Sequence, residues 1–550
     1  MRTVRKGEGK MAGSSSVPPV HPLIAVRLTR RQVLRGMVIA GAVPPLSAVL
    51  AACGGEDEGD GGTPSTPPEE IVRGGVLKIA TPYAVSTLDP IKSVAAGDIE
   101  VLGQIYSRLT RRGPDGKEIL PGLAEGWESS PDGLTWTFTL REAAFSDGST
   151  ITADDVVFSY LRLRDQEDSA YGGAFQVIGD IVALDPKNVQ FTLKGPAAPF
   201  LGSTEQFNAG IVPKAVVGSM GDEGFAKAPV TSGGFGVQEW RPNERLILTA
   251  NTNYWREGLP NLDGVEVIEV LRAPTRVSML EAGEADVARD VPWAQVEQFK
   301  TREDMIVPLD PSSVIYVILL NHQDPVLSNI DVRKAMAMAL DRDGITQAVT
   351  FGNAVTANSL IPNTVDFYDP EATPLPYDPE QAKALIESAG ATGAEIEFLT
   401  TQIDDPATVL VQDQLKAIGL NVTINQVDVG GWWDSVVGAN YGAAVTWWYN
   451  EVPDPDPAVR WALCGECGNS SFFTFYDNPE IDRLTEEALH ETDPAGREEL
   501  YHEIQRIALE DVAQIPMWYQ PYANVYRSWV HDLKMNPAIQ WNLDEAWMNP

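Results

Sequence analysis

The stretch Asp378-Pro-Glu-Gln-Ala-Lys-Ala-Leu-Ile-Glu-Ser-Ala-Gly390 decides the fold class, because it is one unit of a regular alternation. Its Asp-Pro start, its apolar residues at helical spacing and its final glycine predict a helix. The next unit predicts a helix from Pro406 to Ile418 and then the alternating strand Leu420-Asn-Val-Thr-Ile424. Helices that alternate with strands in this way predict an α/β fold.

The same signals extend to both sides of this stretch. Strands are predicted at 75–80 and at 135–140, where apolar residues alternate with threonines in the second case. The Trp-rich last 25 or so residues predict a tail that packs on the body rather than a separate module. The predicted starts of further helices are Thr152 with Asp155, Asp331, Asn478-Pro479 and Asp493-Pro494.

The first 52 residues have the form of an export leader. The pair Arg30-Arg31 precedes a short apolar run, and Leu50-Ala-Ala-Cys53 resembles the site at which bacterial lipoproteins are lipidated and cut. The alternative is a membrane anchor, but the run from Met37 to Ala52 has 16 residues and contains glycine and proline, whereas a span needs about 20 apolar residues. We therefore expect a twin-arginine signal peptide over 1–52. The mature protein would begin at a lipidated Cys53, on the outer face of the cell membrane or in the periplasm.

The composition is strongly acidic. The 550 residues carry a formal net charge of −36, and because residues 1–52 carry +7, the remainder carries −43. Such a charge argues against a nucleic-acid partner and keeps the surface hydrated. Residues 53–70, rich in Gly, Pro, Asp and Glu, predict a disordered tether. The length beyond the tether predicts two to four domains of about 150 residues each, and no later apolar run is long enough to span a membrane.

The two remaining cysteines, Cys464 and Cys467, form a single C-x-x-C pattern. In an exported chain, the default expectation for such a pair is a local disulfide. A zinc site would need two more ligands, and no histidine has ligand spacing near the pair. A thioredoxin-like motif is disfavoured because the pair follows a Pro-rich loop rather than a strand. We predict a disulfide, with free thiols as the alternative, and no metal or cofactor.

A longer block carries a family resemblance. It runs from Pro121-Gly-Leu-Ala-Glu-Gly-Trp127 through Asp132-Gly-Leu-Thr-Trp-Thr-Phe-Thr-Leu-Arg141 to Phe145-Ser-Asp-Gly148 and Thr152-Ala-Asp-Asp-Val-Val-Phe-Ser159. With further matches over nearly all of the mature chain, it resembles an extracellular solute-binding protein of the dipeptide and oligopeptide importer class. Most of the matching residues are caps, turns and core positions, so they identify a family without marking a site. The further matches are Leu88-Asp-Pro90, Asn251-Thr-Asn-Tyr-Trp255, Asp331-Val-Arg-Lys-Ala335, Ala339-Leu-Asp-Arg342, Tyr377-Asp-Pro-Glu380 and Tyr476-Asp-Asn-Pro-Glu-Ile-Asp482.

The resemblance implies a type II periplasmic-binding fold, with two lobes that close over a ligand about a hinge and with an extra subdomain. On that pattern the first lobe takes residues 71–104, 229–312 and 515–550, the extra subdomain takes 105–228, and the second lobe takes 313–514. It further implies a monomer that is not an enzyme. Such a protein captures a di- or oligopeptide, delivers it to the permease subunits of an ABC importer, and here would contact the membrane through its lipid.

One segment offers the aromatic walls and the polar groups that a ligand cleft needs, namely Ala444-Val-Thr-Trp-Trp-Tyr-Asn-Glu-Val-Pro-Asp-Pro-Asp-Pro457. In the peptide receptors that the chain resembles, this stretch carries a tryptophan and, three residues later, an aspartate that pairs with the amino terminus of the peptide. Trp448 and Glu451 hold these places here, and a carboxylate beside a ligand ammonium forms a charge-assisted hydrogen bond. The alternative is that Trp447 faces the cleft while Trp448 packs inside. Asn450 is a further candidate.

Other segments resemble ligand-facing positions of the family. Trp433, after two glycines, corresponds to another ligand-facing tryptophan, with core packing as the alternative. From the opposite lobe, the resemblance points to a cleft strand and to a glycine turn. That turn departs from the family pattern, because its proline is missing and a phenylalanine replaces the tyrosine. The candidates from this lobe are Tyr83, Val85, Ser86, Gly233 and Phe235.

Three functions compete at this point. The first is the peptide receptor described above. The second is the same fold binding a sugar-like, opine, aromatic or metal-chelate solute. It is favoured by the many tryptophans and by Val445, which stands where some relatives place an arginine. The third is an exported hydrolase, which has no support because the sequence contains neither a G-x-S-x-G nor an H-E-x-x-H motif. The residues favour the first function.

Overall fold

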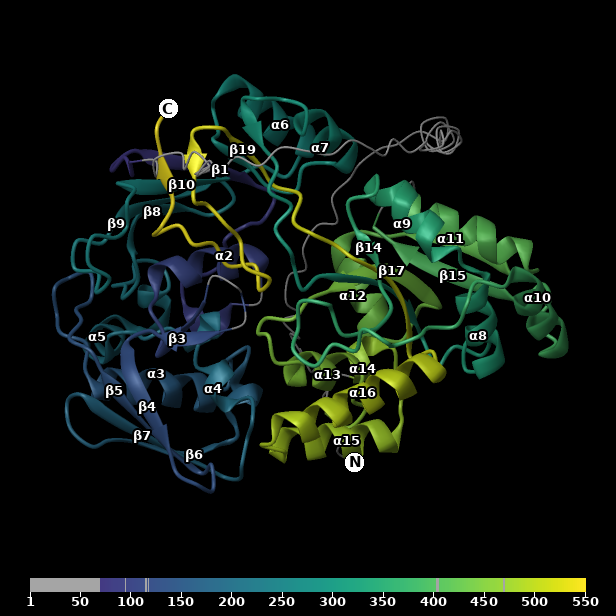
Figure 1. Cartoon of the computed structure of the whole chain (residues 1–550), viewed down its shortest axis with the longest axis horizontal. Helices are drawn as coiled ribbons and strands as arrows, with labels where there is room; N and C mark the ends of the chain where they lie inside the picture. The colour runs from purple at the N-terminus through teal and green to yellow at the C-terminus, as the bar shows by residue number, and fades with distance from the viewer. Residues whose placement is uncertain (1–69, 94, 114–115, 117, 402–404, 468–469) are drawn as a thin grey trace, which may run out of the picture.

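The computed structural model describes residues 70–93, 95–113, 116, 118–401, 405–467 and 470–550 (Figure 1). The twin arginines, Cys53 and the tether up to residue 69 lie outside the described residues. None of the helices in this described part combines the length and the hydrophobicity that a membrane span requires.

The first lobe is built on a seven-stranded sheet in the order β12-β19-β11-β1-β10-β9-β8. Its central strand β1 (Val76–Thr81) runs parallel to both of its neighbours. Helix α2 packs into the core on one face of the sheet, while α6 and α7 belong to a smaller cluster with Ala288 and Val525. The other elements are α2 (Ala96–Ile105), β8 (Phe235–Arg241), β9 (Arg245–Ala250), β10 (Gly264–Glu269), α6 (Ala273–Ala282), β11 (Val287–Ala288), α7 (Trp293–Phe299), β12 (Met305–Ile306) and β19 (Val525–Arg527).

Residues between α2 and β8 add a four-stranded antiparallel sheet in the order β4-β5-β7-β6, with a core of its own. The predicted alternating strand is β5 (Thr135–Leu140), in which Phe138 and Leu140 are buried. Helix α3 (Ala153–Asp165) begins as predicted, because Thr152 and Asp155 form a capping box. The remaining elements are β2 (Thr110–Arg112), β3 (Ile119–Pro121), β4 (Ala124–Ser129), β6 (Ile178–Ala183), β7 (Asn188–Leu193), α4 (Phe200–Ser203) and α5 (Lys214–Phe225).

The second lobe is built on a six-stranded sheet in the order β14-β18-β13-β17-β15-β16. The two faces of this sheet are covered by separate apolar clusters. Its strands are β13 (Ile315–Leu320), β14 (Val355–Thr356), β15 (Glu395–Thr400), β16 (Asn421–Gln426), β17 (Ala443–Trp448) and β18 (Gln514–Tyr519). Its helices are α8 (Ile330–Ala339), α9 (Arg342–Thr350), α10 (Pro379–Ser388), α11 (Pro406–Ala417), α12 (Val429–Val437), α13 (Asp456–Ala462), α14 (Ser470–Phe473), α15 (Pro479–His490) and α16 (Pro494–Glu510).

The helices predicted from Asp-Pro and Asn-Pro starts are confirmed. The side chain of Asp378 accepts the backbone N–H of Gln381 at the start of α10, and Asp405 accepts that of Thr408 at the start of α11. Each proline occupies the first turn, where its missing N–H leaves no intrahelical bond unmade. Strands β15 and β16 run parallel on either side of α11, as the predicted alternation requires.

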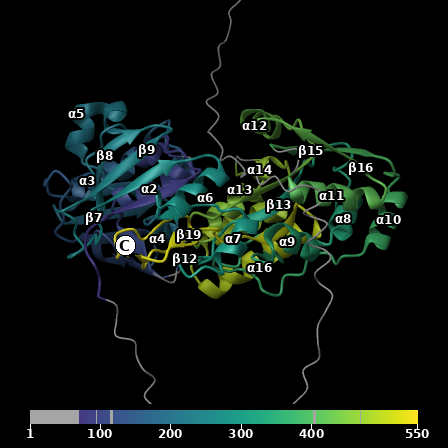
Figure 2. The same cartoon turned by 90° about the horizontal axis from the view of Figure 1, so that it is seen from above.

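Two short segments connect the lobes, which stand side by side in Figures 1 and 2. The chain enters the second lobe over 307–314 and returns over 520–524. The two segments are hydrogen-bonded to each other, because the N–H of Gln520 donates to the carbonyl of Val314 at 3.1 Å and that of Tyr522 to the carbonyl of Asp310 at 3.0 Å. This pair of crossings is the natural place for a hinge.

The C-terminal tail packs on the first lobe. It adds the small pair β20 (Val530–His531) and β21 (Trp547–Met548), and it buries Trp541 and Trp547. Strand β18 pairs with β13, so the second lobe extends to Tyr519 and not only to residue 514. The division into lobes and subdomain remains our proposal, with that one boundary moved.

Candidate functional site

A cavity of about 160 Å³ lies between the lobes, beside the two crossing segments. Its lining includes Asp290 from the first lobe, Gln520 and Tyr522 from a crossing segment, and Trp447 from the second lobe. An apolar cavity of about 150 Å³ can hold a benzene ring. The cavity therefore has room for one side chain rather than for a whole peptide.

Aromatic rings from both lobes form part of the walls of this cavity. Tyr316 stacks on Trp518, with ring centroids 4.4 Å apart. Apolar walls with a few placed polar groups are typical of ligand sites, because the walls supply burial and the polar groups fix orientation. The aromatic residues that line the cavity are Tyr83, Trp293, Tyr316, Phe351, Trp447, Trp518 and Tyr522.

Among the described residues that line the cavity, Arg289 is the only lysine, arginine or histidine, and its guanidinium is already engaged. It donates to the carboxylate of Glu100 and, at 2.9 Å, to the amide oxygen of Asn524. The guanidinium also lies 5.2 Å from the centroid of the Tyr83 ring. Burial by itself lowers the pKa of Arg289, but the carboxylates of Glu100 and Asp290 raise it above its ordinary value. Arg289 is thus a fixed structural cation.

Two carboxylates also line the cavity, one from each lobe. Asp290 follows β11, and Asp405 is the N-cap of α11. The Tyr83 hydroxyl donates a hydrogen bond to Asp290, and burial raises the pKa of Tyr83 well above its ordinary value. Burial likewise raises the pKa of Asp405, although the hydrogen bonds from Thr408 oppose that rise.

Of the residues predicted to face a ligand, Tyr83 and Trp447 line this cavity. The structure places Trp448 in the core of the second lobe instead, where it is 3% exposed and its indole N–H donates to Gln514 at 3.2 Å. The reason is the two-residue repeat of β17, which turns consecutive side chains to opposite faces of the sheet. Val445 and Trp447 face the cavity, whereas Ala444 and Trp448 face the core.

The candidates Val85 and Ser86 stabilise the first lobe itself. Val85 is buried in its core, and the Ser86 hydroxyl donates to Asp98 at 2.7 Å. Burial raises the pKa of Asp98 to about 6, and the hydrogen bonds from Ser86 oppose that rise. Neither residue lines the cavity.

The candidates Gly233 and Phe235 also have structural places. A Cβ added to Gly233 would lie 2.3 Å from the carbonyl oxygen of Gln104, so the glycine is needed for close packing against the end of α2. Phe235 is fully buried in the core of the first lobe. Neither residue lines the cavity, and ligand contact at this turn stays a prediction.

Trp433 lies on α12 and also packs outside the cavity. Its ring makes edge contacts with Trp432 and Phe473, at centroid distances of 5.1 and 5.8 Å. It belongs to the partly buried border of the second-lobe core. The core-packing alternative fits this position.

Glu451 lies elsewhere in the seam between the lobes, where its Oε1 accepts a hydrogen bond from the hydroxyl of Tyr171 at 3.3 Å. Tyr171 belongs to the part of the chain between α2 and β8. Burial raises the pKa of Glu451 to about 7, and hydrogen bonds from the backbone and from Tyr171 oppose that rise. A neighbouring ammonium would favour the ionised form of such a carboxyl. Its role toward an amine remains a prediction.

Asn450, beside Glu451, fixes the loop after β17. Its amide N–H₂ donates to the carbonyls of Val452 and Asp454 at 2.9 and 3.0 Å. Its own carbonyl accepts the Ser313 hydroxyl at 2.7 Å, so this loop is tied to the segment that enters the second lobe. The side chain is buried and does not line the cavity.

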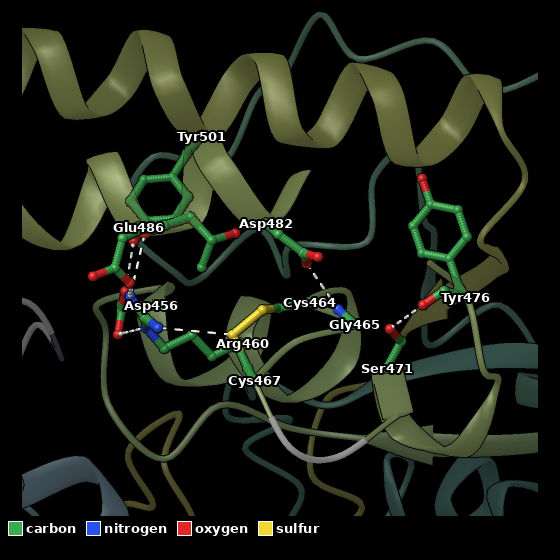
Figure 3. The surroundings of a disulfide bond; sticks show 11 residues. Asp456, Arg460, Cys464, Gly465, Cys467, Ser471, Tyr476, Asp482, Glu486 and Tyr501 are labelled. Carbon is green, nitrogen blue, oxygen red and sulfur yellow. Dashed lines mark hydrogen bonds and ion pairs between the residues drawn. A yellow bond between two sulfur atoms is a disulfide. The ribbon is translucent and has the colours of Figure 1, made fainter. Parts of the chain in front are cut away.

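Cys464 and Cys467 are joined by a disulfide just after α13 (Figure 3). The guanidinium of Arg460 lies 3.7 Å from the Cys467 sulfur and also pairs with Asp456, as Figure 3 shows. Neither cysteine lines the cavity. Within the described residues, no group of three or more His, Cys, Asp or Glu side chains is placed to hold a metal ion.

Sequence reasoning missed Arg289, Asp290 and Asp405. The signal that could have found them is positional. Arg289 and Asp290 follow β11, and Asp405 opens the helix that follows β15. Both strands pair in parallel with a neighbour, and ligands of open α/β sheets lie beyond the carboxyl ends of such strands.

The family is decided by comparison with known proteins. The model for bacterial extracellular solute-binding proteins, family 5, middle part, matches residues 118–470. The chain belongs to this family. The resemblance inferred from the sequence, and with it the two-lobed α/β fold, is thereby confirmed.

Individual family 5 relatives match most of the chain. A probable D,D-dipeptide-binding periplasmic protein, DdpA, of Escherichia coli is 28% identical, covering 82% of this chain and 90% of its own. The periplasmic binding protein DppA of Helicobacter pylori, solved with the peptide STSA, is 27% identical with a TM-score of 0.76, covering 87% of this chain and 99% of its own. MoaA of A. tumefacien, solved with mannopinic acid, is 27% identical with a TM-score of 0.74, covering 83% and 95%.

Proposed function

We propose that this family 5 protein is the substrate-binding subunit of an ABC importer and that it captures a di- or oligopeptide between its lobes. The observation that carries the proposal is the aromatic cavity, which takes residues from both lobes and from the segments that connect them. The peptide-binding relatives add support, since their similarity extends over most of both chains.

The connection between the lobes supports closure over a ligand. With only two crossing segments, backbone changes over 307–314 and 520–524 are sufficient to move one lobe against the other. A peptide that contacts both walls of the cavity would favour the closed arrangement, because it gains contacts that the open arrangement lacks. The closed form is the one we expect the permease subunits to recognise, with the protein itself acting as a monomer.

Export and anchoring belong to the same proposal. The leader at 1–52 would export the chain through the twin-arginine route, and lipid on Cys53 would hold it at the outer face of the membrane or in the periplasm. The stretch 53–70 would let the receptor move near its permease. Replacing Cys53 by serine should release the protein from the membrane fraction, which fractionation and immunoblotting would detect.

The central test is binding of defined peptides to purified protein freed of bound ligand. Isothermal titration with di- and tripeptides should give saturable binding, and N-terminal acetylation should weaken it if Glu451 pairs with the amine. Equal affinity for free and acetylated peptides would remove the role assigned to Glu451. Failure of every peptide to bind would remove the proposed substrate class.

The second candidate is a sugar-like or opine solute. The aromatic walls favour it, and so does the solved relative that holds mannopinic acid. The two carboxylates of the cavity argue against an acidic solute, because Arg289 is already paired with Glu100. Mass spectrometry of the ligand released from freshly purified protein separates the candidates, since a recovered glycan or opine would exclude a peptide carrier.

A further inference from the structure

The two carboxylates of the cavity come from opposite lobes and line it together with Tyr316. Burial is the main cause that raises the pKa of Tyr316, and the charges of Asp405 and Asp290 raise it further. Both carboxylates therefore act on one phenol group in the cavity wall. A ligand group beside Tyr316 would lie between charges that belong to different lobes.

Both carboxylates keep hydrogen-bonding capacity. Asp405 accepts two bonds from Thr408 at 2.7 and 2.6 Å, both at Oδ2, and the described residues provide none to its Oδ1. Oδ2 of Asp290 is buried without a hydrogen-bond partner among the described residues. An ionised carboxylate can accept about four hydrogen bonds. Oδ1 of Asp290 already lies 3.8 Å from the Arg289 guanidinium, so each carboxylate keeps one oxygen that receives no hydrogen bond from the described residues.

The charged groups that the structure describes around the cavity leave an excess of negative charge. Among them, two guanidinium groups, those of Arg289 and Arg276, face three carboxylates, those of Glu100, Asp290 and Asp405. Arg276 donates four of its five N–H groups to backbone carbonyls, including that of Asp290, and it does not line the cavity. A cationic group would balance this excess, whereas an anionic group would increase it.

The aromatic walls also favour a cationic group. A cation over the face of a tyrosine or tryptophan ring is attracted by the ring quadrupole, by about 0.5–2 kcal/mol depending on desolvation. Tyr83, Trp447 and Trp518 supply such rings next to the carboxylates. The volume of about 160 Å³ is the size of one side chain.

We infer that the cavity selects peptides with a cationic side chain, the ammonium of lysine or the guanidinium of arginine, held between Asp290 and Asp405. The inference rests on the proposed function, because it names the substrate class of the same site. A cation that bridges carboxylates from both lobes also stabilises the closed arrangement, in which the two negative charges would otherwise repel each other.

The test compares lysine with norleucine, which has nearly the same apolar stem and no charge. The probes are Lys-Ala-Ala, Ala-Lys-Ala and Ala-Ala-Lys, each with its norleucine counterpart and each with a free and an acetylated amino terminus. We expect at least one lysine peptide to bind about 10- to 100-fold more tightly than its counterpart, as a hydrogen-bonded charge contributes in a desolvated site. That preference should persist after acetylation, which separates a side-chain cation from the terminal ammonium.

Two substitutions assign the preference to the cavity. Asp405→Asn and Asp290→Asn remove a charge each, and both should keep the fold. Asparagine is as good an N-cap as aspartate, and it tolerates the φ of 47° at position 290. Each variant should lose most of the preference for lysine over norleucine. Asp413→Asn is the matched control, because Asp413 is exposed on the same helix as Asp405 and should leave the preference unchanged.

The outcomes separate the two proposals. Equal affinity for lysine and norleucine at all three positions would overturn the inference and leave the peptide receptor intact. The same holds if both variants keep the full preference, or if acetylation abolishes it. Binding of none of the peptides would overturn the proposed function, and the inference with it.

Discussion

Consecutive tryptophans at the end of β17 belong to two different regions of the molecule. Trp448 lies in the core of the second lobe, with its indole N–H bonded to Gln514. Trp447 lies in the seam between the lobes, which we define as the cavity lining together with the Glu451–Tyr171 contact. The core is filled by the chain's own side chains, whereas the seam keeps a cavity and incompletely bonded carboxylates. The difference teaches that residues of one strand can serve stability on one face and recognition on the other.

Two buried carboxylates in or next to the seam differ in the same way. Glu100 lies behind the cavity lining, where it is paired with Arg289 and is structural. Glu451 has a tyrosine hydroxyl as its side-chain partner and a pKa raised by burial to about 7. A buried carboxylate is costly unless it is paired or protonated. Only a carboxylate without an arginine partner, such as Glu451, is available to a ligand cation.

The largest expected effect separates the two tryptophans. Trp448→Ala should lower the free energy of unfolding by about 4 kcal/mol. The substitution leaves a cavity in a fully packed site, and the amide oxygen of Gln514 loses its hydrogen-bond donor. Trp447→Ala should lower the free energy of unfolding much less and should instead weaken peptide binding. Chemical denaturation and isothermal titration on both variants measure this. Equal destabilisation by the two would contradict the assignment of Trp447 to the seam.

The next effect tests the paired carboxylate. Arg289→Met should lower the free energy of unfolding by about 3 kcal/mol, because it leaves Glu100 buried without its partner. Burial raises the pKa of Glu100 already, so protonation limits the loss. The double variant Arg289→Met with Glu100→Gln should recover part of the stability in denaturant titrations. A double variant no more stable than the single one would show that Arg289 acts mainly through other contacts.

Glu451, which has no ion-pair partner among the described residues, should make the free energy of unfolding depend on pH. With a pKa raised from 4.5 to about 7 in the folded state, Glu451 keeps its proton over a window in which the unfolded chain has released it. Stability is therefore lost as pH rises through that window. Glu451→Gln should match the unmodified protein in stability at pH 4 and exceed it by about 3 kcal/mol at pH 8.

Denaturant titrations at both pH values check this difference, and the comparison between variants cancels other titrating groups such as Asp98. Tyr171→Phe is the matched change on the opposite side of the contact. It should raise the pKa of Glu451 further, since the hydroxyl now opposes the effect of burial. A stability difference that does not depend on pH would count against a raised pKa.

The smallest effect lies outside the seam. Replacing Cys464 and Cys467 by serine should cost about 1–2 kcal/mol, because a disulfide that closes so short a loop constrains the unfolded chain little. Peptide affinity should stay unchanged, as neither residue lines the cavity. A loss of affinity would show that the region after α13 is coupled to the seam.

Most of the fold was accessible from sequence because its signals are local. The caps at Asp378 and Thr152 act within one helical turn, and each appears where the pattern predicted it. The site was accessible only in part, with Tyr83 and Trp447 among the predicted residues that line the cavity. Ser86 and Gly233 belong to segments that resemble ligand-facing ones, but their contacts are within the first lobe.

The sequence by itself determined the α/β class, the family and the proposal of an exported receptor, since these depend on residues close together in the chain. Only the tertiary structure decided which face of β17 meets the other lobe, and that Asp290 and Asp405 line one cavity. A two-residue repeat shows that neighbouring tryptophans point apart, but not which of them meets a ligand. That choice depends on how two sheets from distant parts of the chain are placed by the crossings at 307–314 and 520–524.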